Sequence, residues 1–142
     1  MNKNFHHSSF TVINPCPPTP FQDNYFYLIY GISVFTHLDE ELQFKWLDEL
    51  KRICRPDAIV AMSVHGGVPK KRPEMEVMLR DKGFADMKGN KTFLFNQIED
   101  KDYYRETKHS REYILREWYR YFQVIEFIYQ GLGCQDLIIL SP

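Results

Sequence analysis

The stretch YFYLIYGISVF, residues 25–35, is continuously apolar and aromatic and shows no strict alternation with polar residues. A run of this length and kind is typical of a strand covered on both faces, as in a parallel sheet. A second apolar run, AIVAMSV, follows at residues 58–64. The residues between the two runs favour a helix. The sequence from 25 to 64 therefore predicts a strand, a helix and a strand, the βαβ unit of an α/β fold.

The helix between the two runs has start and stop signals. Thr36 or Asp39 can cap its first turn, and the acidic residues that follow suit the positive end of the helix dipole. Pro56 cannot continue a helix, so the helix is expected to end before Arg55-Pro56. One face has apolar side chains at helical spacing: Leu42, Trp46, Leu47, Leu50, Ile53 and Cys54.

Two further helices are expected in the middle of the chain. Pro73 suits a first helical position and Gly83 suits the residue just past a helix end. Ser110 can cap another helix. The polar, tyrosine-rich residues 100–109 predict a surface segment, and the secondary structure of residues 92–98 is ambiguous.

The C-terminal part predicts a hairpin. Residues 123–129 and 136–140 are apolar, β-type runs, and the glycine-containing residues 131–133 between them suit a turn. The fold class expected from the whole pattern is α/β, with a mostly parallel sheet closed by a C-terminal antiparallel hairpin.

Composition narrows the class of protein. The chain has 142 residues, 18 basic and 19 acidic side chains and a net charge of -1, which argues against a globally basic nucleic-acid binder. Its three cysteines, Cys16, Cys54 and Cys134, form no CxxC pair, so free thiols in a cytoplasmic protein are expected. No apolar run is long enough to cross a membrane, and Met1 to Phe10 is no signal peptide. One domain is expected over residues 10–142, after a disordered tail at residues 1–9.

Candidate chemistry follows from the expected sheet. Ligands of open α/β sheets gather at the carboxyl ends of the strands, which selects residues 14–17, 31–37 and 65–67. Within them, Ser33 and His37 can form hydrogen bonds, and His65 can act as an acid or base near neutral pH. Simpler interpretations remain open, since His37 can bond only backbone and His65 can belong to an ordinary turn. The sequence has no phosphate-cradling glycine loop and no evident metal-ligand motif.

Several segments resemble the class I S-adenosylmethionine-dependent methyltransferases, and most closely the small-molecule methyltransferases of the type 11 and type 12 groups. The segments that carry the resemblance are PFQDNYFYLIY (20–30) with SVFTHL (33–38), the helix motif from Trp46 to Pro56, SVHG (63–66), residues 104–110 and QDLIIL (135–140). The resemblance covers residues 10–140, which correspond to the C-terminal half of the family domain. Tyr27 stands where the family has an acidic residue. The family's first strand with its glycine-rich loop, and its second strand with an acidic end, are not in this sequence and would lie before Met1.

The resemblance implies a partial Rossmann-like methyltransferase domain that uses S-adenosylmethionine. It assigns Asn14 and Cys16 to the adenine loop and Tyr30, Gly31, Ile32 and Ser33 to the cofactor-lining strand end. It also implies that His37, His65 and His109 border the substrate, a small-molecule methyl acceptor, with His65 or His37 as a base. One rival interpretation is a non-catalytic remnant or interaction subunit that binds no cofactor by itself. A second is that the sequence is an incomplete part of an active enzyme.

The edge of the predicted sheet has its own consequence. The strand at residues 26–31 would be internal in the complete family fold, but here only one of its edges is expected to be paired. An unpaired apolar strand recruits a partner. We therefore expect a homo-oligomer, or a partner chain that completes the sheet, with no nucleic-acid or membrane partner.

Overall fold

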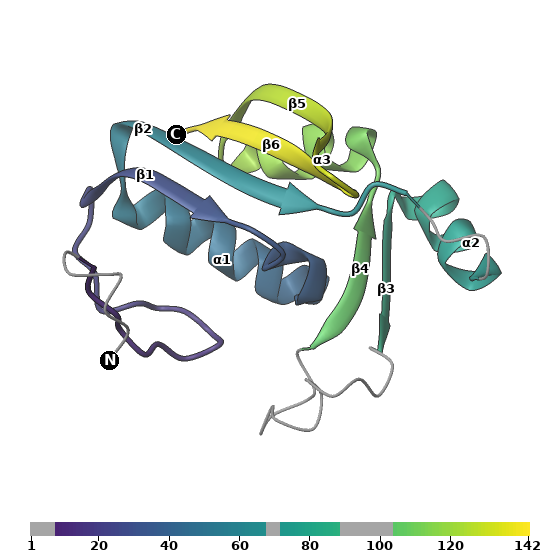
Figure 1. Cartoon of the computed structure of the whole chain (residues 1–142), viewed down its shortest axis with the longest axis horizontal. Coiled ribbons are helices and arrows are strands. Elements are labelled where there is room, and N and C mark those ends of the chain that lie inside the picture. The colour runs from purple at the N-terminus through teal and green to yellow at the C-terminus, as the bar shows by residue number, and fades with distance from the viewer. Residues whose placement is uncertain (1–7, 68–71, 89–103) are drawn as a thin grey trace.

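The two apolar stretches pair as parallel strands. The computed structural model describes residues 8–67, 72–88 and 104–142. Its main sheet has the strand order β1-β2-β6-β5 (Figure 1). β1 (Phe26–Gly31) runs parallel to β2 (Cys54–Val64), while β6 (Gln135–Ser141) is antiparallel to both β2 and β5 (Gln123–Leu132). The expected hairpin is confirmed. A mostly parallel sheet is wrong for these strands, because the hairpin inserts β6 beside β2 and adds two antiparallel pairs.

The connection between the parallel strands is helix α1 (Glu40–Ile53), as predicted. Of the two expected caps, Asp39 is the one used, since its carboxylate accepts a hydrogen bond from the Leu42 amide at 2.8 Å. Thr36 instead lies in a 3-10 turn, η1 (Phe35–His37), and donates to the Ser33 carbonyl. The helix ends three residues before Pro56, which lies within β2 and not in a loop.

A second, two-stranded sheet extends from the end of β2 (Figure 1). It pairs β3 (Phe84–Lys88) with β4 (Arg105–His109), between α2 (Pro73–Lys82) and α3 (Arg111–Glu117), which leads into η3 (Trp118–Arg120). Pro73, Gly83 and Ser110 bound the helices as predicted. The surface segment predicted at residues 100–109 is wrong at its end, because Thr107, Lys108 and His109 of β4 are buried.

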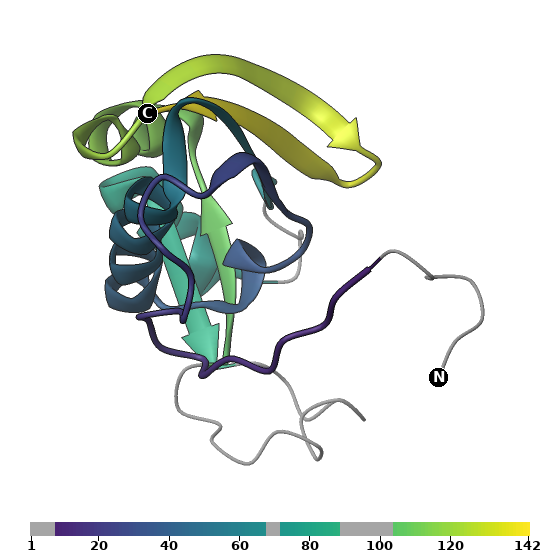
Figure 2. The same cartoon turned by 90° about the vertical axis from the view of Figure 1, so that its left-hand side faces the viewer.

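The two faces of the main sheet differ. Residues opposite one another in register share a face. The covered face packs against α1 and α3, and its residues are almost fully buried: Ala58, Val60, Met62, Val64, Ile138 and Leu140. The open face has no described helix over it (Figure 2), and its residues are Leu28, Tyr30, Ile59, Ala61, Leu137 and Ile139.

The expectation that the first strand is covered on both faces is therefore wrong for the described part of the chain. Leu28 is 59% exposed and Tyr30 is 70% exposed. The reason is that both lie on the open face of β1, which among the described strands pairs only with β2.

Some expectations concern residues that the structure does not describe. The ambiguous segment at residues 92–98 and most of the expected tail, residues 1–7, lie outside the described ranges. Within those ranges, no helix is long and apolar enough to cross a membrane.

Candidate functional site

Three polar side chains form a closed hydrogen-bond network at the carboxyl ends of β1 and β2. The Ser33 amide donates to Ser63 Oγ at 2.8 Å, and Ser63 Oγ donates to Gln135 Oε1 at 2.6 Å. The Gln135 amide nitrogen returns a hydrogen bond to Ser33 Oγ at 2.7 Å. The network joins the loop after β1, the end of β2 and the start of β6, so it fixes the geometry of this end of the sheet.

Ser33 is held in a conformation that serine rarely adopts. Its φ is +59°, in the left-handed region, which costs on the order of 1 kcal/mol for a non-glycine residue. The hydrogen bonds to Ser63 and Gln135, and the Thr36 hydroxyl that donates to the Ser33 carbonyl at 3.0 Å, hold the turn. Ser33 Oγ accepts from Gln135, and its own proton has no acceptor within the described part of the chain. That proton remains available to a ligand.

The three residues before Ser33 differ in how much of their surface is accessible to a ligand. Tyr30 and Ile32 are 70% and 56% exposed, so their apolar surfaces are available at the strand end. Gly31 is buried, and a Cβ there would lie 2.6 Å from Met62 Sδ. The methionine of the neighbouring strand β2 thus occupies the space beside Gly31.

His37 lies beside this end of the sheet on η1. Its Nδ1 is 3.1 Å from the Arg105 carbonyl, and its ring stacks on Tyr104 at 4.6 Å between centroids. Because a carbonyl only accepts, Nδ1 carries the proton, which leaves Nε2 with a lone pair. The expected backbone hydrogen bond of His37 is thus present at Nδ1. The lone pair of Nε2 is not used by that bond.

His65 follows β2 directly, and its carbonyl accepts a hydrogen bond from the His109 amide at 2.8 Å. Burial, with a smaller contribution from the Lys108 ammonium, lowers the pKa of His65 below its usual value. The ring is therefore neutral at pH 7 and can accept a proton. His37 also lies near enough to lower the pKa of His65, so the structure brings these two histidines to the same end of the molecule.

His109 is different, because its ring is completely buried. Gln43 donates both of its amide protons to the Phe35 and Leu38 carbonyls, so its Oε1 must accept from His109 Nε2, at 2.8 Å. Burial lowers the pKa of His109 to about 3. The His109 ring therefore stays neutral and ties β4 to α1.

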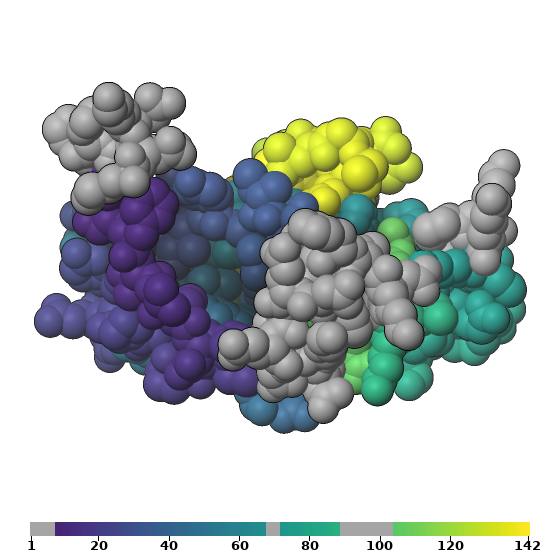
Figure 3. All heavy atoms as spheres, turned by 60° about the horizontal axis from the view of Figure 1, so that its bottom comes forward, coloured from purple at the N-terminus to yellow at the C-terminus, as the bar shows by residue number. Residues whose placement is uncertain are grey.

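Asn14 and Cys16 lie on the N-terminal segment, which runs over the surface of the molecule and is purple in Figure 3. This segment is attached to α1, since Trp46 Nε1 donates to the Pro15 carbonyl at 2.8 Å and the Thr19 hydroxyl donates to Glu49. Cys16 is exposed and lies within electrostatic reach of Lys45 on α1. No described hydrogen bond joins Asn14 or Cys16 to residues 30–33.

The sequence patterns do not select two members of this network, Ser63 and Gln135, as site residues. Ser63 had a usable signal, because it is the only hydroxyl in the apolar run AIVAMSV. No local sequence pattern marks Gln135. It lies 102 residues after Ser33 in the sequence, and only the register of β6 on β2 brings the two together. Within the described residues, no group of three or more His, Cys, Asp or Glu side chains could hold a metal ion.

Comparisons with known proteins give a consistent result for the fold. No family model matches this sequence. No curated protein matches it either. Among solved structures, one described as a SAM-dependent methyltransferase from Methanosarcina mazei superposes with a TM-score of 0.62 at 14% identity. The chain shares the fold of SAM-dependent methyltransferases.

The methyltransferase fold extends over 93% of this chain but 66% of the Methanosarcina mazei chain. A protein from Pyrococcus horikoshii OT3 gives a TM-score of 0.56 at 14% identity, over 88% of this chain and 55% of that one. This chain therefore spans less than two thirds of the length of either structure. In a fold of this type the carboxyl ends of parallel strands are the usual place for a ligand, and that is where Ser33, Ser63, His37 and His65 lie.

Proposed function

We propose that this chain is part of a SAM-dependent methyltransferase that acts on a small-molecule acceptor. The observation that carries the proposal is the Ser33–Ser63–Gln135 network at the carboxyl ends of the two parallel strands, in a chain with the methyltransferase fold. A strained turn held by several hydrogen bonds at a strand end is a feature that functional sites use.

The residues at the strand end fit one part of the cofactor. Tyr30 and Ile32 offer exposed aromatic and aliphatic surfaces for the adenine ring, and the Ser33 hydroxyl offers a proton to a ribose or acceptor oxygen. The carboxylate and the glycine-rich backbone loop that the resemblance implies are not in this sequence. We propose that they come from a chain segment that pairs with the free edge of β1, and that this segment tightens a cofactor site that the strand end of this chain already forms in part.

S-adenosylmethionine, when bound, supplies an electrophilic methyl group on a positively charged sulfur. The residues of this chain would position the acceptor by contacts at the strand end. An acceptor that loses a proton needs a base within hydrogen-bond reach. His37 Nε2, with its lone pair, and His65, which is neutral at pH 7, are the proposed proton acceptors.

Calorimetric titration of the purified chain with S-adenosylmethionine and S-adenosylhomocysteine tests this function. Dissociation constants of tens of micromolar or tighter, about -6 kcal/mol, are the expected result. Ser33→Ala should weaken binding about fivefold to tenfold, the effect of one hydrogen bond. Ser141→Ala, at the far end of β6, is the matched control and should bind like the unchanged chain. Absence of binding to the chain in every assembly state would overturn the proposal.

A second candidate function is favoured by the open face of the sheet. Leu28, Tyr30 and Ile59 are substantially exposed, and β1 has an unpaired edge among the described strands. We propose as the alternative that the chain is a non-catalytic interaction subunit that forms a homo-oligomer, or binds a partner, through these residues. Light scattering at micromolar concentration tests the homo-oligomer, and a clean monomer would contradict it.

A further inference from the structure

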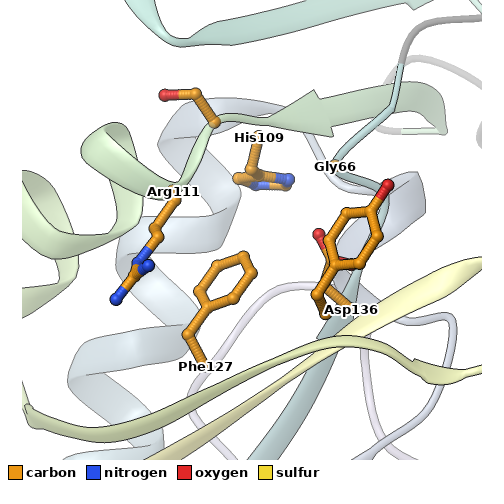
Figure 4. Close-up of a pocket in the computed structure, with 7 residues that line it drawn as sticks. Gly66, His109, Arg111, Phe127 and Asp136 are labelled. Carbon is orange, nitrogen blue, oxygen red and sulfur yellow. The ribbon is translucent and has the colours of Figure 1, made fainter.

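A cavity of about 460 Å³ lies on the covered side of the sheet end (Figure 4). It is lined by residues from the loop after β2, the end of β4, the start of α3 and the β5–β6 hairpin: Gly66, His109, Ser110, Arg111, Phe127, Tyr129 and Asp136. Successive side chains of a strand point to opposite faces. Gln135 therefore joins the network with Ser33, while its neighbour Asp136 faces this cavity.

Asp136 is a buried carboxylate with unused hydrogen-bonding capacity. It is only 4% exposed, and its Oδ1 accepts a hydrogen bond from the backbone N–H of Gln130 at 2.8 Å. Its Oδ2 has no hydrogen bond or ion pair within the described residues. A buried carboxylate is costly to leave unpaired, so a cation at Oδ2 would be favourable.

Gly66 keeps the space in front of that oxygen. A Cβ at this position would lie 2.1 Å from Asp136 Oδ2, a distance that no side chain can take without moving the carboxylate. The loop after β2 can therefore pass Asp136 only with glycine here. The result is that Oδ2 borders the cavity next to backbone and not next to a side chain.

The positive charge of Arg111 lies on the other side of the Phe127 ring from the Asp136 carboxylate. The guanidinium of Arg111 is 5.7 Å from the centre of the Phe127 ring and forms no ion pair within the described residues. Figure 4 shows Arg111 and Asp136 on opposite sides of this ring, with His109 above it. The cavity thus presents a cation, an aromatic surface and a carboxylate in that order.

We propose that this cavity binds a small zwitterion of the amino-acid type. The ligand's ammonium group pairs with Asp136 Oδ2, its carboxylate pairs with Arg111, and its hydrocarbon part lies on Phe127 and Tyr129. The volume is in the range of small-molecule sites, and an inorganic dianion is disfavoured because Asp136 would repel it. This site does not depend on methyl transfer, since it lies on the other side of the strand ends from the Ser33 network.

The first test compares three related probes by NMR titration of the full chain. L-phenylalanine has both charged groups, phenethylamine has only the ammonium and 3-phenylpropionate has only the carboxylate. We expect L-phenylalanine to bind at least tenfold more tightly than either of the others, with shifts at residues 66, 111 and 136. Equal binding of the three probes, or no binding of L-phenylalanine at 10 mM (about the weakest affinity that such a site would have), would overturn the proposal.

The second test assigns each charged group to its residue. Asp136→Asn should weaken phenylalanine and phenethylamine at least fivefold and leave 3-phenylpropionate unchanged. Arg111→Gln should weaken phenylalanine and 3-phenylpropionate and leave phenethylamine unchanged. Arg116→Gln, on the same helix but outside the lining of this cavity, is the control and should change none of them. Equal loss of all three probes in both variants would contradict the assignment. Because only binding is measured, the result is independent of whether the chain binds S-adenosylmethionine.

Discussion

The covered and open faces of the main sheet are made by the same four strands and by similar side chains. Val60, Met62 and Ile138 on the covered face are at most 2% exposed, while Ile59 on the open face is 41% exposed and its neighbour Leu28 is 59% exposed. Strands with one face in water normally alternate apolar and polar residues. Leu28 and Tyr30 of β1, Ile59 and Ala61 of β2, and Leu137 and Ile139 of β6 make the open face of these three strands apolar as well, which is the pattern of a sheet covered on both sides. The comparison shows that sequence pattern and observed exposure disagree on one face only.

The largest expected effect tests this difference directly. Ile138→Ala should lower the free energy of unfolding by about 2–5 kcal/mol, because it leaves a cavity in the core. Ile59→Ala should lower it by about 1 kcal/mol or less, because the side chain is already partly in water. Urea denaturation of both variants, followed by circular dichroism, measures the difference. An equally large loss for Ile59→Ala would mean that the open face is covered in solution.

The covered side should also control how stability depends on pH. His109 has a pKa of about 3 in the folded chain against 6.5 when unfolded. Its contribution to stability is therefore complete above pH 6.5 and is lost as the pH falls toward 3, by about 1.4 kcal/mol per pH unit. NMR titration of the histidine ring protons gives the measurement. The His109 signal should not titrate above pH 4, and a midpoint near 6.5 would contradict its buried, neutral state.

A medium effect is expected at the Ser33–Ser63–Gln135 network at the carboxyl ends of β1 and β2. Gln135→Ala removes the partners of Ser63 and Ser33 and should destabilise the fold by about 1–2 kcal/mol. Gln123→Ala, on an exposed position of β5, is the control and should change stability by less than about 0.5 kcal/mol. Thermal and urea unfolding measure both variants. If the two substitutions cost the same, the network does not hold the strand ends together.

The smallest change in stability, with the most direct bearing on function, is expected at Leu28. Leu28→Lys places a charge on the open face and should leave the free energy of unfolding within about 0.5 kcal/mol of the unchanged chain. The same substitution should shift any oligomer toward monomer, because an unpaired charge in an apolar interface is costly. Sedimentation measures the second effect. An unchanged oligomer would exclude the open face around Leu28 as the interface.

The sequence predicted helix boundaries well, because helix caps act on backbone groups only a few residues away. Asp39, Pro73, Gly83 and Ser110 act through neighbouring backbone groups, so the three helices could be predicted from their caps. β4 could not, because its polar residues read as surface. Their burial depends on pairing with β3 and on long-range contacts, such as Thr107 donating to the Phe35 carbonyl 72 residues away in sequence.

The candidate site divides in the same way. The position of Ser33, His37 and His65 at this end of the sheet could be predicted, since each lies within six residues after an apolar strand. Their roles in a site stay predictions. The position of Gln135, Arg111 and Asp136 could not be predicted, because only the register of β6 on β2 and the docking of α3 bring them to this end of the sheet. The assignment of Asn14 and Cys16 to the cofactor stays a prediction.

The βαβ unit, the helix caps and the closing hairpin follow from local sequence, because periodicity and capping act over a few residues. Packing between distant segments determines which face of the sheet is covered, that Met62 fills the space beside Gly31, and that the His109 ring is fully buried. The substrate role of His109 stays a prediction. The same packing determines that Asp136 faces Arg111 across Phe127. These depend on strand register and on packing between segments far apart in the chain, where a shift of one residue would turn every side chain to the other face.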